Sequence, residues 1–241
     1  MTPQSLAVLY HIFYEDIMDS IIHELSPLSP YQPYYFFNIN AETPNAFEIK
    51  SFLFLHFPDC VITISSNKGK DIGGKLILLN ICLQLGIRPN WFVFLHDKKS
   101  LHALNSKTWK SDLLAIISSK NFDKIETFTS QKDCGIIAAN NYVHCELMQD
   151  GKFVSTNGPI LEDLIQLYKL EIKNHQYVAG TMFWARAKPV IDFFTTFNPL
   201  QVRVTLEEGN VIDNYKGSHT HSWERLLSWI ITSKGWEIKT T

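Results

Sequence analysis

The segment from Asn90 to Ser100 ends an apolar run with a cluster of charges. Residues 91–95 are apolar without alternation, which predicts a strand covered on both faces, and His96-Asp97-Lys98-Lys99-Ser100 follows at once. A carboxylate at such a strand end can hold a divalent cation, and two adjacent lysines can neutralise a diphosphate with or without that metal. The plainer alternative is a solvated acid–base cluster at a loop tip.

A second candidate segment is a glycine-bearing loop between a predicted strand and a predicted helix, SNKGKDIGG at residues 66–74. Gly69 relieves the steric limit on the turn, and N–H groups at the helix start, with Lys68 and Lys70, offer a place for a phosphate or diphosphate. The loop is neither a Walker A motif nor G-x-G-x-x-G, so the glycine pattern alone favours a turn with solvated lysines. Asp71 is either the N-cap of the helix or a contact to the nucleobase, the ribose or Lys98, and both interpretations stay open.

Both segments belong to a regular alternation of strands and helices. Apolar runs predict strands at 5–13, 34–40, 60–66 and 91–96, and periodic patterns predict helices at 14–25, 45–57 and 71–86. Strands that are apolar throughout predict an α/β fold with a mostly parallel, Rossmann-type sheet and helices on both faces. Ligands bind outside the carboxyl ends of such strands, where His11, Asn38 and Asn40 also lie.

The second half of the chain is less regular. Its patterns predict helices at 105–118, 187–197 and 220–235 and strands at 134–139 and 177–186. No repeat, low-complexity tract or linker separates the two halves, so residues 1–241 are expected to form one domain. Residues 1–100 form its nucleotide-type half, and residues 101–241 form an irregular second half.

Composition narrows the class of protein. The chain has 241 residues, a net charge of −2, 45% hydrophobic and 19% charged residues, values that argue against disorder and against a basic field for nucleic acid. The four cysteines are scattered without zinc-ligand spacing, which favours reduced thiols and a cytoplasmic protein. The first residues lack the basic region of a signal peptide, and the chain nowhere has 18 consecutive apolar residues, so at most a peripheral membrane contact is expected.

Five ordered motifs carry a resemblance to a known family. They are His11-Ile12-Phe13-Tyr14, Asn67 to Gly73, His96 to Ser100 with Trp109 to Leu114 after it, Ala179 to Arg186, and the set Gly217, Ser218, His221, Glu224 and Arg225. The chain resembles the rhamnan synthesis F family, bacterial glycosyltransferases that build rhamnose-containing and related surface polysaccharides. The matches cover nearly the whole chain in order.

The resemblance implies an activity, its partners and a location. The fold is expected to be GT-A-like, with residues 1–100 binding a nucleoside-diphosphate sugar and residues 101–241 carrying the acceptor and catalytic side. The expected reaction moves a sugar, with rhamnose the family expectation, to a growing surface polysaccharide or lipid-linked oligosaccharide with inversion. A divalent metal, Mn²⁺ or Mg²⁺, is the implied cofactor, and nucleic acid is not an expected partner. The expected location is the cytoplasm, including the inner face of the cytoplasmic membrane.

The same resemblance assigns roles to individual residues. Nucleotide-sugar contacts are expected from His11, Asn67, Lys68, Gly69, Lys70, Asp71, His96, Asp97, Lys98 and Lys99. Gly180 and Thr181 are expected to lie against the donor sugar, and Trp184 to offer its ring face to a pyranose. Asp97 and His221 are the candidate metal ligands, with His221 alternatively a phosphate contact whose ring Glu224 orients.

The catalytic base and two alternative functions remain open. Glu208 is the first candidate for the base and Asp213 the second, because both precede the final helix, although Glu207 could also take the family's acidic position. The family commonly has Asp where this chain has Lys216, which motivates a non-catalytic sugar-nucleotide or polysaccharide-binding protein as an alternative. An NAD-linked oxidoreductase is disfavoured, because the dinucleotide fingerprint is missing and no acid ends the second strand.

Overall fold

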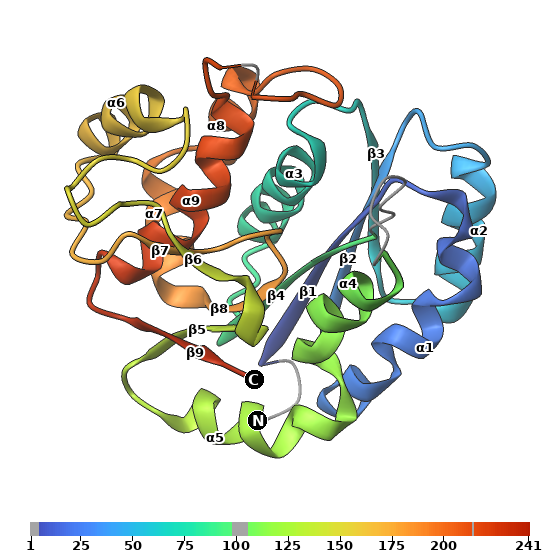
Figure 1. Ribbon diagram of the computed structural model, residues 1–241. Coiled ribbons are helices and arrows are strands. Elements are labelled where there is room, and N and C mark those ends of the chain that lie inside the picture. The colour runs from blue at the N-terminus through green and yellow to red at the C-terminus, as the bar shows by residue number, and fades with distance from the viewer. Residues whose placement is uncertain (1–4, 98–105, 214) are drawn as a thin grey trace.

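A seven-stranded sheet organises the molecule. The computed structural model describes residues 5–97, 106–213 and 215–241, with the backbone alone for 106–109 (Figure 1). The strand order is β3-β2-β1-β4-β8-β5-β9, and a separate pair joins β6 to β7. The strands are β1 Leu6–Ile12, β2 Tyr34–Asn40, β3 Val61–Ser65, β4 Trp91–His96, β5 Cys134–Ala138, β6 Val143–Cys145, β7 Gln176–Val178, β8 Phe183–Arg186 and β9 Glu237–Thr240.

The four strands β1 to β4 form a parallel unit, and their register determines which polar residues lie side by side. His11 on β1 pairs with Asn38 on β2 and with His96 on β4. Paired residues in neighbouring parallel strands point to the same face, so these three polar side chains gather at one edge of the sheet. Strand β8 is antiparallel to β4 and to β5, and β9 is parallel to β5.

Helices cover both faces of the sheet (Figure 1). One face packs against α3, α6, α7, α8 and α9, and the other against α1, α2, α5 and the turn η3. The helices are α1 Ile21–Leu25, α2 Ala46–His56, α3 Lys70–Gln84, α4 Ser106–Leu113, α5 Phe122–Ser130, α6 Gly158–Tyr168, α7 Ala187–Thr196, α8 Pro199–Thr205 and α9 His219–Thr232. The 3₁₀ turns are η1 Glu15–Asp19, η2 Ser26–Tyr31, η3 Leu114–Ile117, η4 Ser119–Asn121 and η5 Asn140–Tyr142.

The sheet separates two hydrophobic cores. Along β1, Ala7 and Leu9 belong to the core under α3 and α9, whereas Leu6, Val8 and Tyr10 belong to the core under α1 and α2. Every residue of β1 is buried, because both faces of a parallel sheet are covered. The apolar run that lacks alternation is therefore a consequence of having a helix layer on each side.

The predicted α/β class, with a mostly parallel sheet between helices, is confirmed, and the departures lie outside the four parallel strands. The predicted strand 177–186 is two strands, β7 and β8, in different sheets, because Gly180 and Thr181 between them have φ of 77° and 51°. The predicted helix 14–25 is a 3₁₀ turn followed by a short helix, and the edge strand β9 was not predicted. Within the described residues, none of the helices is both long enough and apolar enough for a membrane crossing.

Candidate functional site

A pocket lies at the carboxyl ends of β1 and β4. Its volume is about 420 Å³. It is lined by His11, Phe13, Tyr14, Asn67, Lys70, Asp71, His96, Asp97, Asn210, Val211 and Ile212. These residues come from two strand ends, from the loop and first turn of α3, and from the segment between α8 and α9. The pocket thus joins the predicted glycine loop to the predicted charged strand end.

His11 is a buried, neutral side chain at the floor of this pocket. It is 3% exposed, and its Nδ1 lies 2.8 Å from Asn38 Oδ1. Burial lowers the pKa of His11 to about 4, so the ring carries no charge at neutral pH. Helix α3 can lie this close to His11 because Gly74 has no Cβ, and a Cβ there would overlap His11 Nδ1.

A buried ion pair supports the wall beside His11. Lys75 is fully buried on α3, and its Nζ lies 2.8 Å from Asp71 Oδ2 and 3.1 Å from His96 Nδ1. The same ammonium donates to the carbonyl and the hydroxyl of Thr181, at 2.9 Å and 2.6 Å, and that hydroxyl also contacts Asp71. Burial raises the pKa of Asp71, but the charges of Lys75 and His96 outweigh it and hold that pKa well below its usual value.

Asp97 holds the loop that follows β1. Its carboxylate accepts hydrogen bonds from the backbone N–H of Phe13, at 2.9 Å to each oxygen, and of Tyr14, at 2.6 Å. Burial raises the pKa of Asp97 to about 7, against the opposing effect of these N–H groups. The acid at the strand end thus fixes the chain across the sheet edge from β4 to β1.

Backbone groups of the glycine loop form hydrogen bonds with the segment between α8 and α9. Gly69 N donates to Glu207 O at 2.8 Å, and Gly209 N donates to Asn67 O at 2.8 Å. Lys68 forms an ion pair with Glu208 at 3.2 Å, where the Glu208 side chain is 67% exposed. The loop is therefore tied to the segment between α8 and α9 rather than open to solvent along its length.

Lys70 connects the pocket to the start of α9. Its Nζ donates to Val211 O at 2.6 Å and lies 3.4 Å from His221 Nε2. A left-handed φ of 51° at Lys70 follows the φ of 76° at Gly69 in this first turn. Among the described residues that line the pocket, Lys70 is the one lysine or arginine.

Asp213 forms a dyad with His221. The Asp213 carboxylate contacts His221 Nδ1 and accepts from Ser218 Oγ at 2.7 Å and Asn157 Nδ2 at 2.9 Å. Partial burial raises the pKa of Asp213, but the hydrogen bonds from Ser218, Asn157 and His221 outweigh it and lower that pKa. An ionised carboxylate held in this way fixes the imidazole with its Nε2 toward Lys70.

Glu207 occupies the N-terminus of α9. Its carboxylate accepts from the N–H of His219 at 2.6 Å, the N–H of Thr220 at 2.9 Å and Thr220 Oγ1 at 2.6 Å. Burial raises the pKa of Glu207, but the bonds from Thr220 and His219 outweigh it and lower that pKa to about 2. Glu207 is thus an anchor for the helix that carries His221.

The described residues do not fit the metal site predicted at Asp97 and His221. Asp97 accepts three hydrogen bonds from two backbone N–H groups, and His221 lies between Asp213 and Lys70, outside the pocket lining. In the part of the chain that the structure describes, no three His, Cys, Asp or Glu side chains come together as metal ligands. A metal at this pair would have to displace the backbone N–H groups from Asp97 and the Lys70 ammonium from His221.

Eleven of the predicted nucleotide-sugar contacts lie in the described residues. Six of them meet at one place, and five do not line the pocket: Lys68, Gly69, Gly180, Thr181 and Trp184. His11, Asn67, Lys70, Asp71, His96 and Asp97 line the pocket. The expectation for Trp184 is wrong, because its side chain is fully buried and its indole N–H donates to Ile116 O at 2.7 Å. Gly180 and Thr181 do not line the pocket: Thr181 is buried against Lys75, and Gly180 N donates to Glu224 Oε1 at 2.6 Å. Lys98 and Lys99 lie outside the described residues.

The two predicted bases differ in their surroundings. Glu208 is exposed, pairs with Lys68 and does not line the pocket, whereas Asp213 is part of a hydrogen-bonded dyad. The first choice of base is therefore placed at the surface by the structure.

Sequence reasoning missed Lys75 and Asn157. Lys75 could have been found as a charged residue four positions after Asp71 in an otherwise apolar helix, the spacing of an ion pair. Asn157 lies 56 positions before its partner Asp213, and no local pattern marks it. Both residues position other groups instead of lining the pocket.

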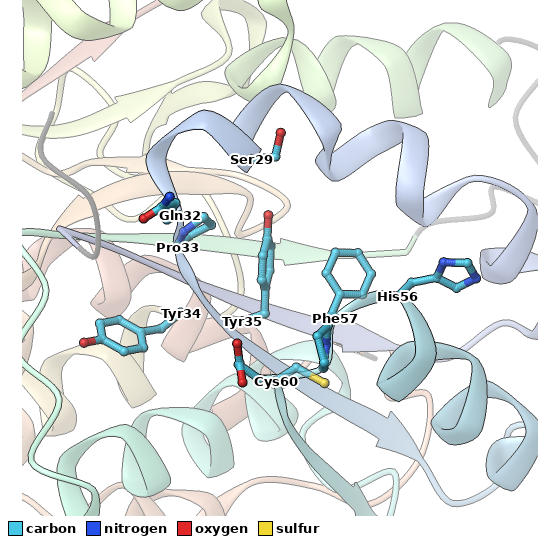
Figure 2. A pocket seen from close by; sticks show the side chains of 10 residues that line it. Ser29, Gln32, Pro33, Tyr34, Tyr35, His56, Phe57 and Cys60 are labelled. Atoms are coloured by element: carbon cyan, nitrogen blue, oxygen red, sulfur yellow. The ribbon is translucent and has the colours of Figure 1, made fainter.

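A larger pocket, of about 530 Å³, lies at the opposite edge of the sheet (Figure 2). Its walls include Tyr34 and Tyr35 at the start of β2, and His56, Phe57 and Cys60 between α2 and β3. Burial raises the pKa of the Cys60 thiol to about 11, so that thiol is not activated. Larger volume alone does not make this amino-end pocket the candidate site, because most of the described polar residues that line it are exposed or half-buried.

Fold and site together define an α/β protein with a polar pocket at the carboxyl edge of a parallel sheet. The family model described as rhamnan synthesis protein F matches residues 1–236, so the chain belongs to that family. This confirms the resemblance drawn from the five motifs.

The chain is similar to two curated relatives and to a solved structure. The relatives, both named uncharacterized protein WxcX, come from two strains of Xanthomonas campestris pv. campestris, and each is 22% identical over 98% of this chain. The match covers 32% of each relative, so the chain spans about a third of the length of the curated relatives it matches. A mannosyltransferase from Pyrobaculum calidifontis, solved with GDP-Man and Mn²⁺, is similar with a TM-score of 0.44 and 11% identity, covering 100% of this chain and 55% of that one.

Proposed function

We propose that this chain is a glycosyltransferase domain that binds a nucleoside-diphosphate sugar in the carboxyl-end pocket and transfers the sugar to a glycan or lipid-linked glycan. The observation that carries the proposal is the convergence of three family motifs, at His11, Asn67–Asp71 and His96–Asp97, on one pocket of about 420 Å³. Family membership supports a role in building polysaccharide. Rhamnose as the sugar, inversion as the outcome and a location in the cytoplasm, or at the inner face of its membrane, are part of the same proposal.

The diphosphate is placed beside Lys70. A departing nucleoside diphosphate needs positive charge near its oxygens, and Lys70 is the cation that lines the described part of the pocket. Its partners there include a carbonyl oxygen and the Nε2 of His221, either of which a phosphate oxygen can replace. Lys98 and Lys99, in the predicted role of further phosphate contacts, remain part of the proposal.

The acceptor hydroxyl is proposed to lose its proton to the Asp213–His221 dyad. Asp213 holds the Nδ1 edge of the ring, which leaves Nε2 as the atom that takes a proton. When a phosphate draws Lys70 away, that nitrogen becomes available beside the pocket. Glu208 remains the alternative base, in which role it has to leave its ion pair with Lys68.

A second candidate function is a sugar-nucleotide-binding protein without catalysis. The observation that favours it is the Lys70 ammonium, which lies 3.4 Å from the one nitrogen of His221 that could act as a base. Donor hydrolysis or transfer by the purified protein, lost in Asp213→Asn, would reject this alternative.

Binding of donor nucleotides tests the proposal. A thermal-shift panel of UDP-, GDP- and dTDP-sugars, with and without Mn²⁺, is expected to raise the melting temperature for at least one nucleotide. Calorimetry with that nucleotide should then show affinity reduced about 10- to 100-fold in Lys70→Met, the loss of one charge-assisted phosphate contact. Lys188→Met, which removes an exposed lysine on α7, is the matched control and should bind as the wild type does. No binding by any nucleotide, with or without metal, would overturn the proposal.

A further inference from the structure

Two buried acceptor atoms in the carboxyl-end pocket have no partner among the described protein atoms. They are His11 Nε2 and Asn67 Oδ1. Both side chains are 3% exposed, and both line the pocket. A buried polar atom left without a hydrogen bond costs about 1–3 kcal/mol. Two such atoms in one pocket therefore indicate what a ligand has to supply there.

The hydrogen bonds around His11 determine which of its nitrogens carries the proton. Asn38 Nδ2 donates to Thr63 Oγ1 at 2.8 Å and to Ser65 Oγ at 3.0 Å, which turns Asn38 Oδ1 toward His11. That oxygen accepts from His11 Nδ1 at 2.8 Å. The Nε2 atom of the neutral ring is then a lone-pair acceptor.

The orientation of Asn67 follows from its neighbour. Asn67 Nδ2 lies 3.4 Å from Glu42 Oε2, and at this contact the amide N–H donates to the carboxylate oxygen. The amide oxygen of Asn67 is therefore the atom without a partner. Like His11 Nε2, it is satisfied by an N–H or O–H group and not by another acceptor.

A phosphate is the wrong ligand for this part of the pocket. Phosphate oxygens are acceptors, so a phosphate at His11 and Asn67 would set lone pairs against lone pairs in a buried place. An imide N–H of a nucleobase and the hydroxyls of a ribose or transferred sugar are donors and match both atoms. We propose that His11 and Asn67 form a neutral, donor-seeking floor that holds the N–H or O–H groups of the donor substrate, which leaves the diphosphate to Lys70.

This inference rests on the proposed function for the ligand, but the tautomer of His11 can be measured without one. In protein carrying ¹⁵N-labelled histidine, at pH 7.5, the Nε2 signal of His11 is expected to be that of an unprotonated nitrogen, with Nδ1 protonated. Loss of that signal in His11→Gln assigns it. A protonated Nε2 in the free protein would overturn the inference, whatever the protein binds.

Titration with ligands then tests the floor itself. Uridine, thymidine and guanosine diphosphates and their sugars are the probes, and inorganic diphosphate is the control. The nucleotide that binds is expected to shift the His11 Nε2 signal toward that of a hydrogen-bonded acceptor, whereas inorganic diphosphate is expected to leave it in place. A nucleotide that binds without moving Nε2, or inorganic diphosphate that moves it equally, would overturn the inference while leaving the proposed function standing. If no probe binds at all, the proposed function fails and takes the inference with it.

Altered ligands show which donor group reaches the floor. Loss of the Nε2 shift with the N-methylated base assigns the imide, and loss with the 2′-deoxy nucleotide assigns the ribose. A shift that appears with the nucleotide sugar alone assigns the sugar hydroxyls. Each of these results supports the inference that His11 and Asn67 hold donor groups of the substrate.

Asn67 can be tested by a nearly isosteric change. Asn67→Leu removes the amide oxygen and is expected to weaken nucleotide binding up to about tenfold, the worth of one hydrogen bond. Asn141→Leu is the matched control, because Asn141 is exposed and does not line the pocket, and it should change the affinity less than twofold. Equal losses in the two variants would contradict the role of Asn67, and the histidine signal of the wild type decides the matter should Asn67→Leu fail to fold.

Discussion

The two pockets at opposite ends of the parallel strands differ in how their polar groups are held. At the carboxyl end, His11, Asp71 and Asp97 are fixed by hydrogen bonds with residues of other elements. At the amino end, Tyr35 and Phe57 meet at a ring-centroid distance of 4.8 Å, and His56 is exposed (Figure 2). Both pockets contain groups whose pKa is shifted by burial, but in the smaller one these groups also have hydrogen-bonding partners on other elements. Preorganised polar groups, more than volume, therefore mark the candidate site.

The largest expected effect concerns the dyad at the carboxyl end. Asp213→Asn removes the charge that orients His221 and stabilises its protonated form, so the transfer rate should fall about 10²- to 10⁴-fold with little change in donor affinity. Asp192→Asn, in the exposed pair with Lys188, is the control and should keep the wild-type rate. Full activity in Asp213→Asn, with folding verified by chemical denaturation, would show that the dyad is not catalytic. Catalysis would then no longer distinguish the carboxyl-end pocket from the amino-end pocket.

Breaking the buried ion pair should produce the next largest effect. Lys75→Met leaves the partly buried Asp71, whose side chain is 22% exposed, without its main partner, which should cost about 2–4 kcal/mol of the free energy of unfolding. Lys188→Met breaks an ion pair of the same i,i+4 spacing at the surface and should cost under about 0.5 kcal/mol. Urea denaturation of both variants measures the difference.

A double variant separates the lost charge from lost packing. In Lys75→Met with Asp71→Asn, no buried charge is left unpaired, so part of the stability should return. A double variant no more stable than Lys75→Met would show that packing of the lysine stem, not its charge, holds this wall.

The carboxyl-end site could be predicted because parallel strands place it. The apolar runs predict strands that end at His11 and His96, and a parallel sheet places both strand ends at the same edge, where the two residues pair. The glycine loop could also be predicted from residue type. Gly69 adopts a left-handed conformation and packs closely against Leu206, and both features favour glycine.

What could not be predicted depends on contacts between distant segments. Trp184 was expected to face a sugar because it lies in a family motif, but strand alternation sends its ring into the core beneath η3. Asn157 contacts Asp213 through two loops whose approach leaves no periodic signal. The break between β7 and β8 depends on the left-handed Thr181, a conformation that a β-branched residue seldom adopts and that its type does not predict.

Acid should lower the free energy of unfolding by protonating Glu207, which holds the N-terminus of α9. Its pKa is about 4.5 in the unfolded chain and about 2 in the folded protein, so its contribution is fully present above pH 4.5 and is lost as the pH falls toward 2. Because the side chain is 29% exposed, the contribution is discounted to about 1–2 kcal/mol.

The pH dependence of unfolding checks this against a neighbouring residue. The stability difference between wild type and Glu207→Gln should shrink between pH 4.5 and 2, whereas Glu208→Gln, which removes the same charge from an exposed pair, should differ from wild type by under about 0.5 kcal/mol throughout. A constant gap for Glu207→Gln would show that its ionised form does not anchor α9.

The smallest effect is expected at the amino end. Tyr35→Phe removes a hydroxyl but keeps the ring against Phe57 and Phe37, so the free energy of unfolding should change by under about 0.5 kcal/mol. His56→Gln should be equally mild, because His56 is exposed. Donor affinity in both variants, measured by calorimetry beside Lys70→Met, should stay within twofold of the wild type. A tenfold loss in Tyr35→Phe would break the comparison, because it would place a substrate contact at the edge of the sheet where no network of buried polar groups is found among the described residues.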